Sequence, residues 1–185
     1  MIGKWFILFF ALVFFTFLGC ATTPPAADKR LIPLQEANLE GVLEENEGLE
    51  VLREDARELR DFYRGGVQQK GKAEKKFQEK AYPEALQFYR GSCEFFSTLL
   101  QHLDEDSADY TLFEGTHILF FPNLLMADNH LKMGLIFRAM GQESAAQRHW
   151  KRARSFIKDS LCSERTEWGL SLEGELNSLM ASKKD

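Results

Sequence analysis

Histidine, the side chain best suited to metal binding and to acid–base catalysis at neutral pH, occurs four times in this 185-residue chain. No histidine stands at metal-ligand spacing from a second histidine or a cysteine on one helix. Asp128 and His130 are two residues apart, which places them on different faces of a helix. The sequence also lacks Gly-x-Ser-x-Gly, a phosphate-binding glycine loop, a dinucleotide fingerprint and His-Glu-x-x-His. The four histidines, His102, His117, His130 and His149, are scattered, so we expect no enzyme, no cofactor and no metal. We expect His117, which lies in an irregular insert, to be a loop or core histidine.

Cysteine is the other reactive side chain, and the first of the three cysteines stands in a distinctive context. Residues 5–18 (WFILFFALVFFTFL) are apolar except for Thr16, follow Lys4, and end just before Gly19 and Cys20. This layout is typical of a secretory signal peptide. The 14 residues reach only about 21 Å as a helix, less than the roughly 30 Å hydrocarbon core of a bilayer. A permanent transmembrane helix is therefore disfavoured.

The four residues Phe17-Leu18-Gly19-Cys20 resemble the lipobox of bacterial lipoproteins. The resemblance implies cleavage before Cys20 and attachment of diacylglycerol to its thiol. The two or three acyl chains of such a lipoprotein hold it on a membrane almost permanently. Ala21, at the position where Asp favours retention in the inner membrane, supports an outer-membrane location facing the periplasm. The alternative is an uncleaved signal anchor in which Cys20 has no role.

Charge and composition exclude one class of partner. Removing residues 1–19 takes away Lys4, so 23 basic residues become 22 against 28 acidic ones, a balance of −6. Nucleic-acid binders are normally basic, so we expect no nucleic-acid partner. Hydrophobic residues make up 44% of the chain, which fits one ordinary domain.

After the signal peptide (1–19), prolines without apolar periodicity indicate a lipidated tether over 20–35. The remainder, 36–185, carries apolar side chains three or four residues apart, which predicts an all-α domain. Residues 104–121 stay ambiguous, because a polar start passes into a β-branched and aromatic run. We expect about six or seven helices. The first spans Glu36–Tyr63, and the second follows a break at Gly65-Gly66 and ends near Lys80. The others span Pro83–Leu103, Pro122–Gly141, the stretch from Gly141 to Leu161, and a short stretch after Ser171.

Two segments share an order of small and large residues. Met133-Gly134-x-x-Phe137-x-x-x-Gly141-x-x-x-x-Ala146-x-x-x-Trp150-x-x-Ala153 resembles the tetratricopeptide repeat. In it Gly134 and Ala146 would let two antiparallel helices approach closely, and Gly141 would form the turn. The stretch Ala73-x-x-x-Phe77-x-x-Lys80-Ala81-Tyr82-x-Glu84-Ala85-x-x-x-Tyr89 looks like a second copy, with Lys80 at the turn. The resemblance implies antiparallel helical hairpins in a superhelical array.

Such repeats present a groove to a peptide or a neighbouring protein, so the resemblance implies binding rather than catalysis. Some members of the family hold a terminal carboxylate with Lys and Asn on the first helix. That clamp is absent from this sequence, because the matching positions are Asp128, Leu131, Leu135, Arg138 and Ala139. Asp128 and Arg138 are candidate rim contacts for a partner, or simply exposed charges.

The sequence leaves two further pairings open. Cys93 and Cys162 each stand near the end of the second helix of a hairpin, and they either form a disulfide or are two buried small hydrophobes. The acidic stretch 40–61 and the basic stretch 148–158 either pair within the fold or face different partners.

These features predict a lipid-anchored envelope protein that acts as an adaptor, holding a partner of an envelope complex at the membrane. The first alternative is a small-ligand-binding accessory of a transport system, in which an aromatic insert lines a pocket. The second is a self-associating structural lipoprotein, since two or three repeats are near the minimum for stability. The aromatic insert comprises Tyr110, Phe113, Phe120 and Phe121.

Overall fold

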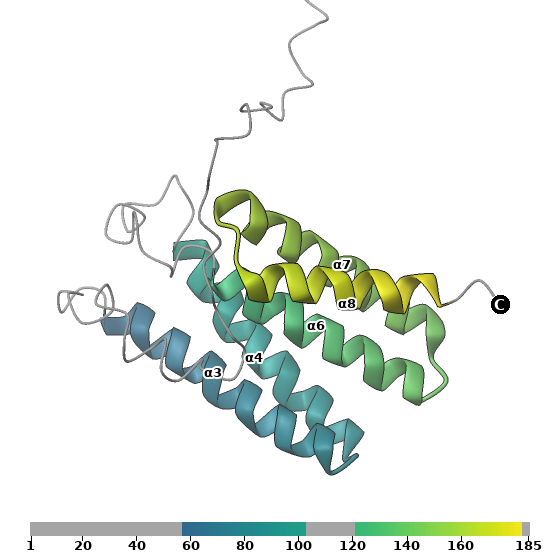
Figure 1. Cartoon of the computed structure of the whole chain (residues 1–185). Helices are drawn as coiled ribbons and strands as arrows, with labels where there is room; N and C mark the ends of the chain where they lie inside the picture. The colour runs from purple at the N-terminus through teal and green to yellow at the C-terminus, as the bar shows by residue number, and fades with distance from the viewer. Residues whose placement is uncertain (1–56, 103–120, 183–185) are drawn as a thin grey trace, which may run out of the picture. The chain divides into compact units, whose positions relative to one another are not determined.

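The computed structural model describes residues 57–102 and 121–182, which form five α-helices and no strand (Figure 1). The all-α prediction is confirmed for this part of the chain. The signal peptide, Cys20, the tether, the acidic stretch up to residue 56 and most of the aromatic insert lie outside the described residues. None of the described helices is both long and apolar enough to cross a membrane. The helices are α3 (Arg57–Gln78), α4 (Tyr82–His102), α6 (Phe121–Ala139), α7 (Glu143–Ser163) and α8 (Glu167–Ala181).

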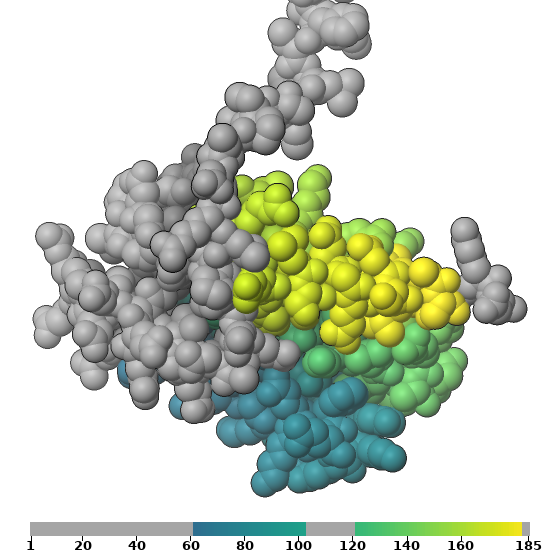
Figure 2. Space-filling model, viewed as in Figure 1, coloured from purple at the N-terminus to yellow at the C-terminus, as the bar shows by residue number. Residues whose placement is uncertain are grey.

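The helices form two hairpins and a fifth helix. α3 packs on α4, α6 packs on α7, and α4 packs on α6 to join the hairpins (Figure 1). α8 lies against α7 and, less extensively, against α6 (Figure 2). Both hairpin turns contain a left-handed residue, since Lys80 has a φ of 59° and Gly141 a φ of 73°. Gly141 therefore forms the turn as predicted, and Lys80 adopts a conformation that glycine adopts more easily.

The predicted break at Gly65-Gly66 is wrong, because α3 runs through both residues. The two glycines instead make room for α4. A Cβ at Gly65 would lie 2.7 Å from Cε1 of Phe95, and one at Gly66 would lie 2.5 Å from Cε1 of Phe96. Ser92 also donates a hydrogen bond of 2.8 Å to the carbonyl of Gly66. The low helix propensity of these glycines is therefore offset by close packing of the two helices.

Close approach recurs in the second hairpin, at small residues that the sequence pattern singled out. Gly134 faces the indole of Trp150, and Trp150 and Ala146 are both fully buried. In the first hairpin, Ala85 and Tyr89 occupy the matching positions, and both are fully buried as well. The two hairpins thus share one local packing pattern, in which a buried small residue precedes a buried large aromatic residue by four positions.

The larger hydrophobic core draws on all five helices, and a smaller one joins α3, α4 and α6. Phe121 belongs to the larger core. Its side chain is 1% exposed, and its ring centroid lies 5.6 Å from that of Trp168 on α8. At this residue of the aromatic insert, the structure shows packing between helices rather than the lining of a pocket.

The last helix begins earlier than predicted. The sequence predicts a start after Ser171, whereas α8 begins at Glu167. Thr166 is the N-cap, and its side-chain oxygen accepts a hydrogen bond of 2.9 Å from the backbone N–H of Gly169. A threonine in this position satisfies a helix N–H group that has no partner within the helix, which explains the earlier start.

Candidate functional site

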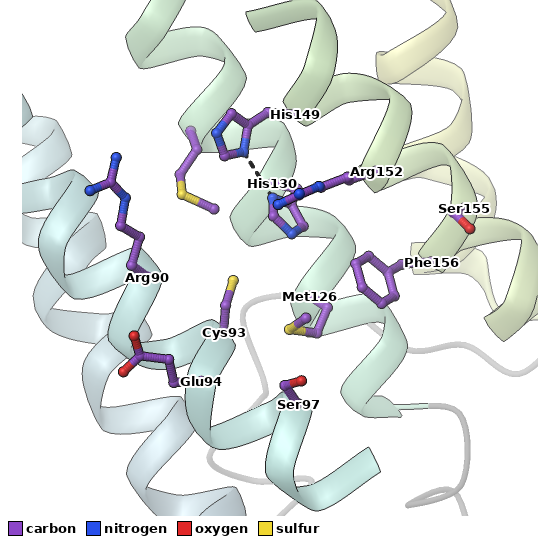
Figure 3. Close-up of a pocket in the computed structure, with 11 residues that line it drawn as sticks. Arg90, Cys93, Glu94, Ser97, Met126, His130, His149, Arg152, Ser155 and Phe156 are labelled. Atoms are coloured by element: carbon purple, nitrogen blue, oxygen red, sulfur yellow. Dashed lines mark hydrogen bonds between the residues drawn. The ribbon is translucent and has the colours of Figure 1, made fainter. Parts of the chain in front are cut away.

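A pocket of about 680 Å³ between α4, α6 and α7 is the strongest candidate for a binding site in the described part of the chain (Figure 3). Arg90 and His149 lie toward one end of it, and Ser97 and Phe156 lie toward the other. These residues are seven positions apart on their helices, so the pocket is roughly 10 Å long. Its eleven lining residues are Arg90, Cys93, Glu94 and Ser97 on α4, Met126, His130 and Met133 on α6, and His149, Arg152, Ser155 and Phe156 on α7.

Two histidines from facing helices meet in this pocket (Figure 3). The Nδ1 atoms of His130 and His149 are 2.9 Å apart. Their rings stand in a row between Phe137 and Phe156, with successive centroid separations of 5.0, 5.1 and 5.6 Å. When both rings are uncharged, one donates its Nδ1–H to the bare Nδ1 of the other. The pair then keeps one donor and one acceptor at its two Nε2 atoms.

Both imidazoles are uncharged at neutral pH. Burial is the main cause that lowers the pKa of His130, to about 3, and the charges of His149 and Arg152 add to the shift. Burial also lowers the pKa of His149, to about 4, with further contributions from Arg152, Arg90 and Arg148. The three arginines therefore create a positive potential at the histidine pair.

Positive charge predominates at the rim of the pocket. Arg90 and Arg152 are exposed, and Glu94 is the single acidic side chain among the eleven lining residues. Neither arginine forms an ion pair with another side chain in the part of the chain that the structure describes. Met126 and Met133 on α6 are 6% and 1% exposed and provide an apolar floor. The pocket thus combines an apolar floor with two arginines that exceed the one acidic side chain among its lining residues.

Asp128, the candidate rim contact or exposed charge, is instead fully buried. It pairs with Lys70 of α3, whose side chain is buried too, and Lys70 also lies 2.5 Å from Glu74. Lys132 is more distant, with its Nζ 3.9 Å from Oδ1 of Asp128. Burial by itself would lower the pKa of Lys70, but the charges of Asp128 and Glu74 outweigh that effect and raise it. Asp128 thus joins α6 to α3 inside the molecule.

Asn129 and Cys93 form a second polar contact between α6 and α4. The side-chain amide of Asn129 donates to Ser92 Oγ at 2.8 Å and approaches Cys93 Sγ at 3.7 Å. Burial raises the pKa of the Cys93 thiol to about 11, so the thiol is protonated at neutral pH. Cys93 and Cys162 are both free, and Cys162 is exposed. The structure therefore contains no disulfide between them, and only Cys93 is largely covered.

Arg138, the other candidate partner contact, is exposed near the end of α6. Its guanidinium carbon lies 5.1 Å from the centroid of the Trp150 ring, which is a cation–π arrangement. The structure does not bring Arg138 and Asp128 to one surface, because Asp128 lies in the core. Of the other histidines, His102 stacks on Phe62 at 6.0 Å, and His117 lies outside the described residues.

Residue spacing within single helices does not predict the histidine pair, because the two histidines lie on different helices. A signal was nevertheless available in the hairpin turn. His130 precedes Gly141 by 11 residues and His149 follows it by eight, so a hairpin folded near that glycine brings the two side chains close together. The same reasoning could not have found Arg90, because its helix belongs to the other hairpin.

In the described helices and turns, no group of three or more His, Cys, Asp or Glu side chains is placed to hold a metal ion. In comparisons with protein-family models, curated proteins and solved structures, nothing matches this chain.

Proposed function

We propose that this chain is a lipid-anchored protein of the bacterial cell envelope that acts as a protein-interaction adaptor. In this proposal, lipid on Cys20 holds the chain on the outer membrane, and the tether over 20–35 lets the helical domain reach a partner in the periplasm. The apolar stretch 5–18 and its Gly19-Cys20 end support the anchor.

The shared packing of the two hairpins is the observation that supports an adaptor most strongly. Ala85 and Tyr89 in one hairpin correspond to Ala146 and Trp150 in the other, and all four are fully buried. Hairpins that repeat one packing pattern are typical of repeat proteins, which present extended surfaces to peptides and proteins. We place the hairpins in a tetratricopeptide-like array and assign Arg138, exposed over Trp150, to the partner surface.

Site-specific cross-linking tests the adaptor function. A photo-reactive phenylalanine analogue replaces Ala139, which is exposed next to Arg138, in cells that carry the full chain. We expect one stoichiometric adduct with an envelope protein, and a weaker adduct when Arg138→Glu is added. The same analogue at Glu173, exposed on α8, is the matched control and should give no such adduct. Adducts with a second copy of this chain alone would favour the self-associating alternative, and no adduct at all would contradict the proposal.

The anchor is tested separately. Cys20→Ala should abolish metabolic incorporation of palmitate. It should also release the chain from the membrane fraction, a result that would contradict the uncleaved signal anchor. A Cys162→Ala variant, which loses an exposed thiol of the helical domain, should keep both properties. Equal palmitate incorporation in the two variants would contradict lipidation at Cys20.

A second candidate function, a small-ligand-binding accessory protein, is favoured by the pocket itself. Its volume of about 680 Å³ falls within the range of about 300–1,000 Å³ that is typical of small-molecule sites. The residues that support this function differ from those of the sequence-based alternative. They come from α4, α6 and α7 rather than from the aromatic insert, of which Phe121 packs in the core.

A further inference from the structure

We propose that the pocket between α4, α6 and α7 binds a small organic carboxylate with an apolar body, whose carboxylate is held by Arg90 and Arg152. The apolar body would lie over Met126 and Met133. This inference gives a ligand class to the second candidate function and does not depend on the adaptor, which uses the Arg138 surface.

Charge is the first argument for this ligand class. Arg90 and Arg152 reach the pocket from two different helices, and neither is neutralised by another described side chain. Guanidinium groups that line one pocket can bind a carboxylate there through charge-assisted hydrogen bonds. Glu94 on the rim disfavours ligands with several negative charges, since like charges repel. A single carboxylate fits this balance better than a polyanion.

The floor of the pocket is the second argument. Met126, Met133 and the ring of Phe156 supply apolar contact beside the arginines. Thioether side chains are flexible and adapt to the shape of an apolar ligand. A free inorganic anion would leave the half-buried ring of Phe156 in contact with water, whereas an organic acid covers it. The pocket is therefore matched to an amphipathic molecule.

Size and hydrogen bonding complete the argument. A pocket roughly 10 Å long holds only about three residues of extended chain, so a small molecule fills it better than a peptide segment. The histidine pair is uncharged at neutral pH and adds no further positive charge. Its donor and acceptor at Nε2 suit a ligand that carries a neutral polar group as well as a carboxylate.

Calorimetric titration of the full chain in a non-ionic detergent tests the proposal, with detergent alone as the blank. The probes are 4-phenylbutyrate, its uncharged counterpart 4-phenylbutanamide, inorganic phosphate and a penta-glutamate peptide. We expect saturable binding of 4-phenylbutyrate at one site, at least tenfold tighter than that of the amide or of phosphate. Binding of 4-phenylbutanamide with equal affinity would overturn the role of charge, and binding of phosphate with equal affinity would overturn the role of the floor.

Variants locate the site. The double variant R90Q/R152Q should weaken binding of 4-phenylbutyrate at least tenfold. Arg154→Gln is the matched control. Arg154 lies on α7, as Arg152 does, but it donates a hydrogen bond of 3.1 Å to Asn177 of α8. This control should bind within twofold of the unmodified chain. Ser97→Trp, at an exposed lining position, should block the pocket without disturbing the core.

Three results would overturn the proposal. The first is that no variant changes binding of 4-phenylbutyrate, and the second is that Arg154→Gln weakens it as much as the double variant. The third is saturable binding of penta-glutamate without binding of 4-phenylbutyrate, which would assign the pocket to an acidic protein segment. None of these results bears on cross-linking from Ala139, so this proposal and the adaptor function succeed or fail independently.

Discussion

Gly134 on α6 lies directly against the indole of Trp150 on α7. A Cβ at position 134 would lie 2.9 Å from Cε2 of that indole and closer still to Nε1 and Cδ1. The Trp150 Nε1–H also donates a 3.3 Å hydrogen bond to the carbonyl of Leu131, which fixes the ring. The glycine is therefore required by the distance between the two helices, and α6 continues through it to Ala139.

This relationship predicts opposite effects for one substitution at two glycines. Gly134→Ala should lower the free energy of unfolding by about 1–3 kcal/mol, because the new methyl group overpacks a buried site. Gly71→Ala in α3 should raise it by about 0.5–1 kcal/mol, because a Cβ there meets nothing within 4 Å and alanine favours the helix. Urea unfolding followed by circular dichroism measures both. Equal effects of the same sign would contradict the proposed packing.

The buried ion pair between Lys70 and Asp128 predicts strong non-additivity. Lys70→Met should lower the free energy of unfolding by about 3–5 kcal/mol, since it leaves the Asp128 carboxylate buried without its partner. Adding Asp128→Leu should recover most of that loss, because two apolar side chains need no counter-charge. The measurement is a double-mutant cycle in urea. Lys76→Met, which removes an exposed partner of Glu79, is the control and should have little effect.

Local signals in the sequence predicted the helices better than the contacts between them. Gly141 stands alone after an apolar stripe, and the left-handed turn there was predicted. The same reasoning from glycine predicts a helix break at Gly65-Gly66. The helix continues there because the two glycines make room for Phe95 and Phe96, about 30 residues later in the chain.

The candidate site was less accessible to sequence reasoning for the same physical reason. Lys70 and Asp128 are 58 positions apart, and nothing in either local segment marks them as partners. Asp128 therefore looks like an ordinary surface charge on a helix. Arg90 and Arg152 likewise come from different hairpins, so their presence in one pocket depends on how α4 packs on α6.

The two cysteines of the helical domain should differ in reactivity. Cys162 is exposed, whereas burial raises the pKa of the Cys93 thiol to about 11 and leaves little thiolate at neutral pH. Brief treatment with iodoacetamide at neutral pH should therefore alkylate Cys162 and spare Cys93, and both should react in urea. Mass spectrometry of the tryptic peptides measures each site. Rapid alkylation of Cys93 in the folded protein would show that α4 and α6 do not cover it.

The histidine pair should make the fold sensitive to mild acid. The pKa values of His130 and His149 are lowered to about 3 and about 4 in the folded protein, against 6.5 for an unperturbed histidine. Between the lowered pKa of each histidine and 6.5, the unfolded chain binds more protons than the folded one. The free energy of unfolding is therefore largest above pH 6.5 and falls as the pH drops. Each fully buried histidine contributes a slope of at most about 1.4 kcal/mol per pH unit, and His149 contributes less because it is partly exposed.

Replacing both rings tests this sensitivity without emptying their positions. In the double variant His130→Phe/His149→Phe, the aromatic row with Phe137 and Phe156 is kept while the titrating nitrogens are removed. Urea unfolding between pH 6.5 and 5, above the range where most carboxylates titrate, should show a falling free energy of unfolding for the unmodified chain and a nearly constant one for the variant. An equally steep fall in the variant would mean that other groups, and not this pair, carry the acid sensitivity.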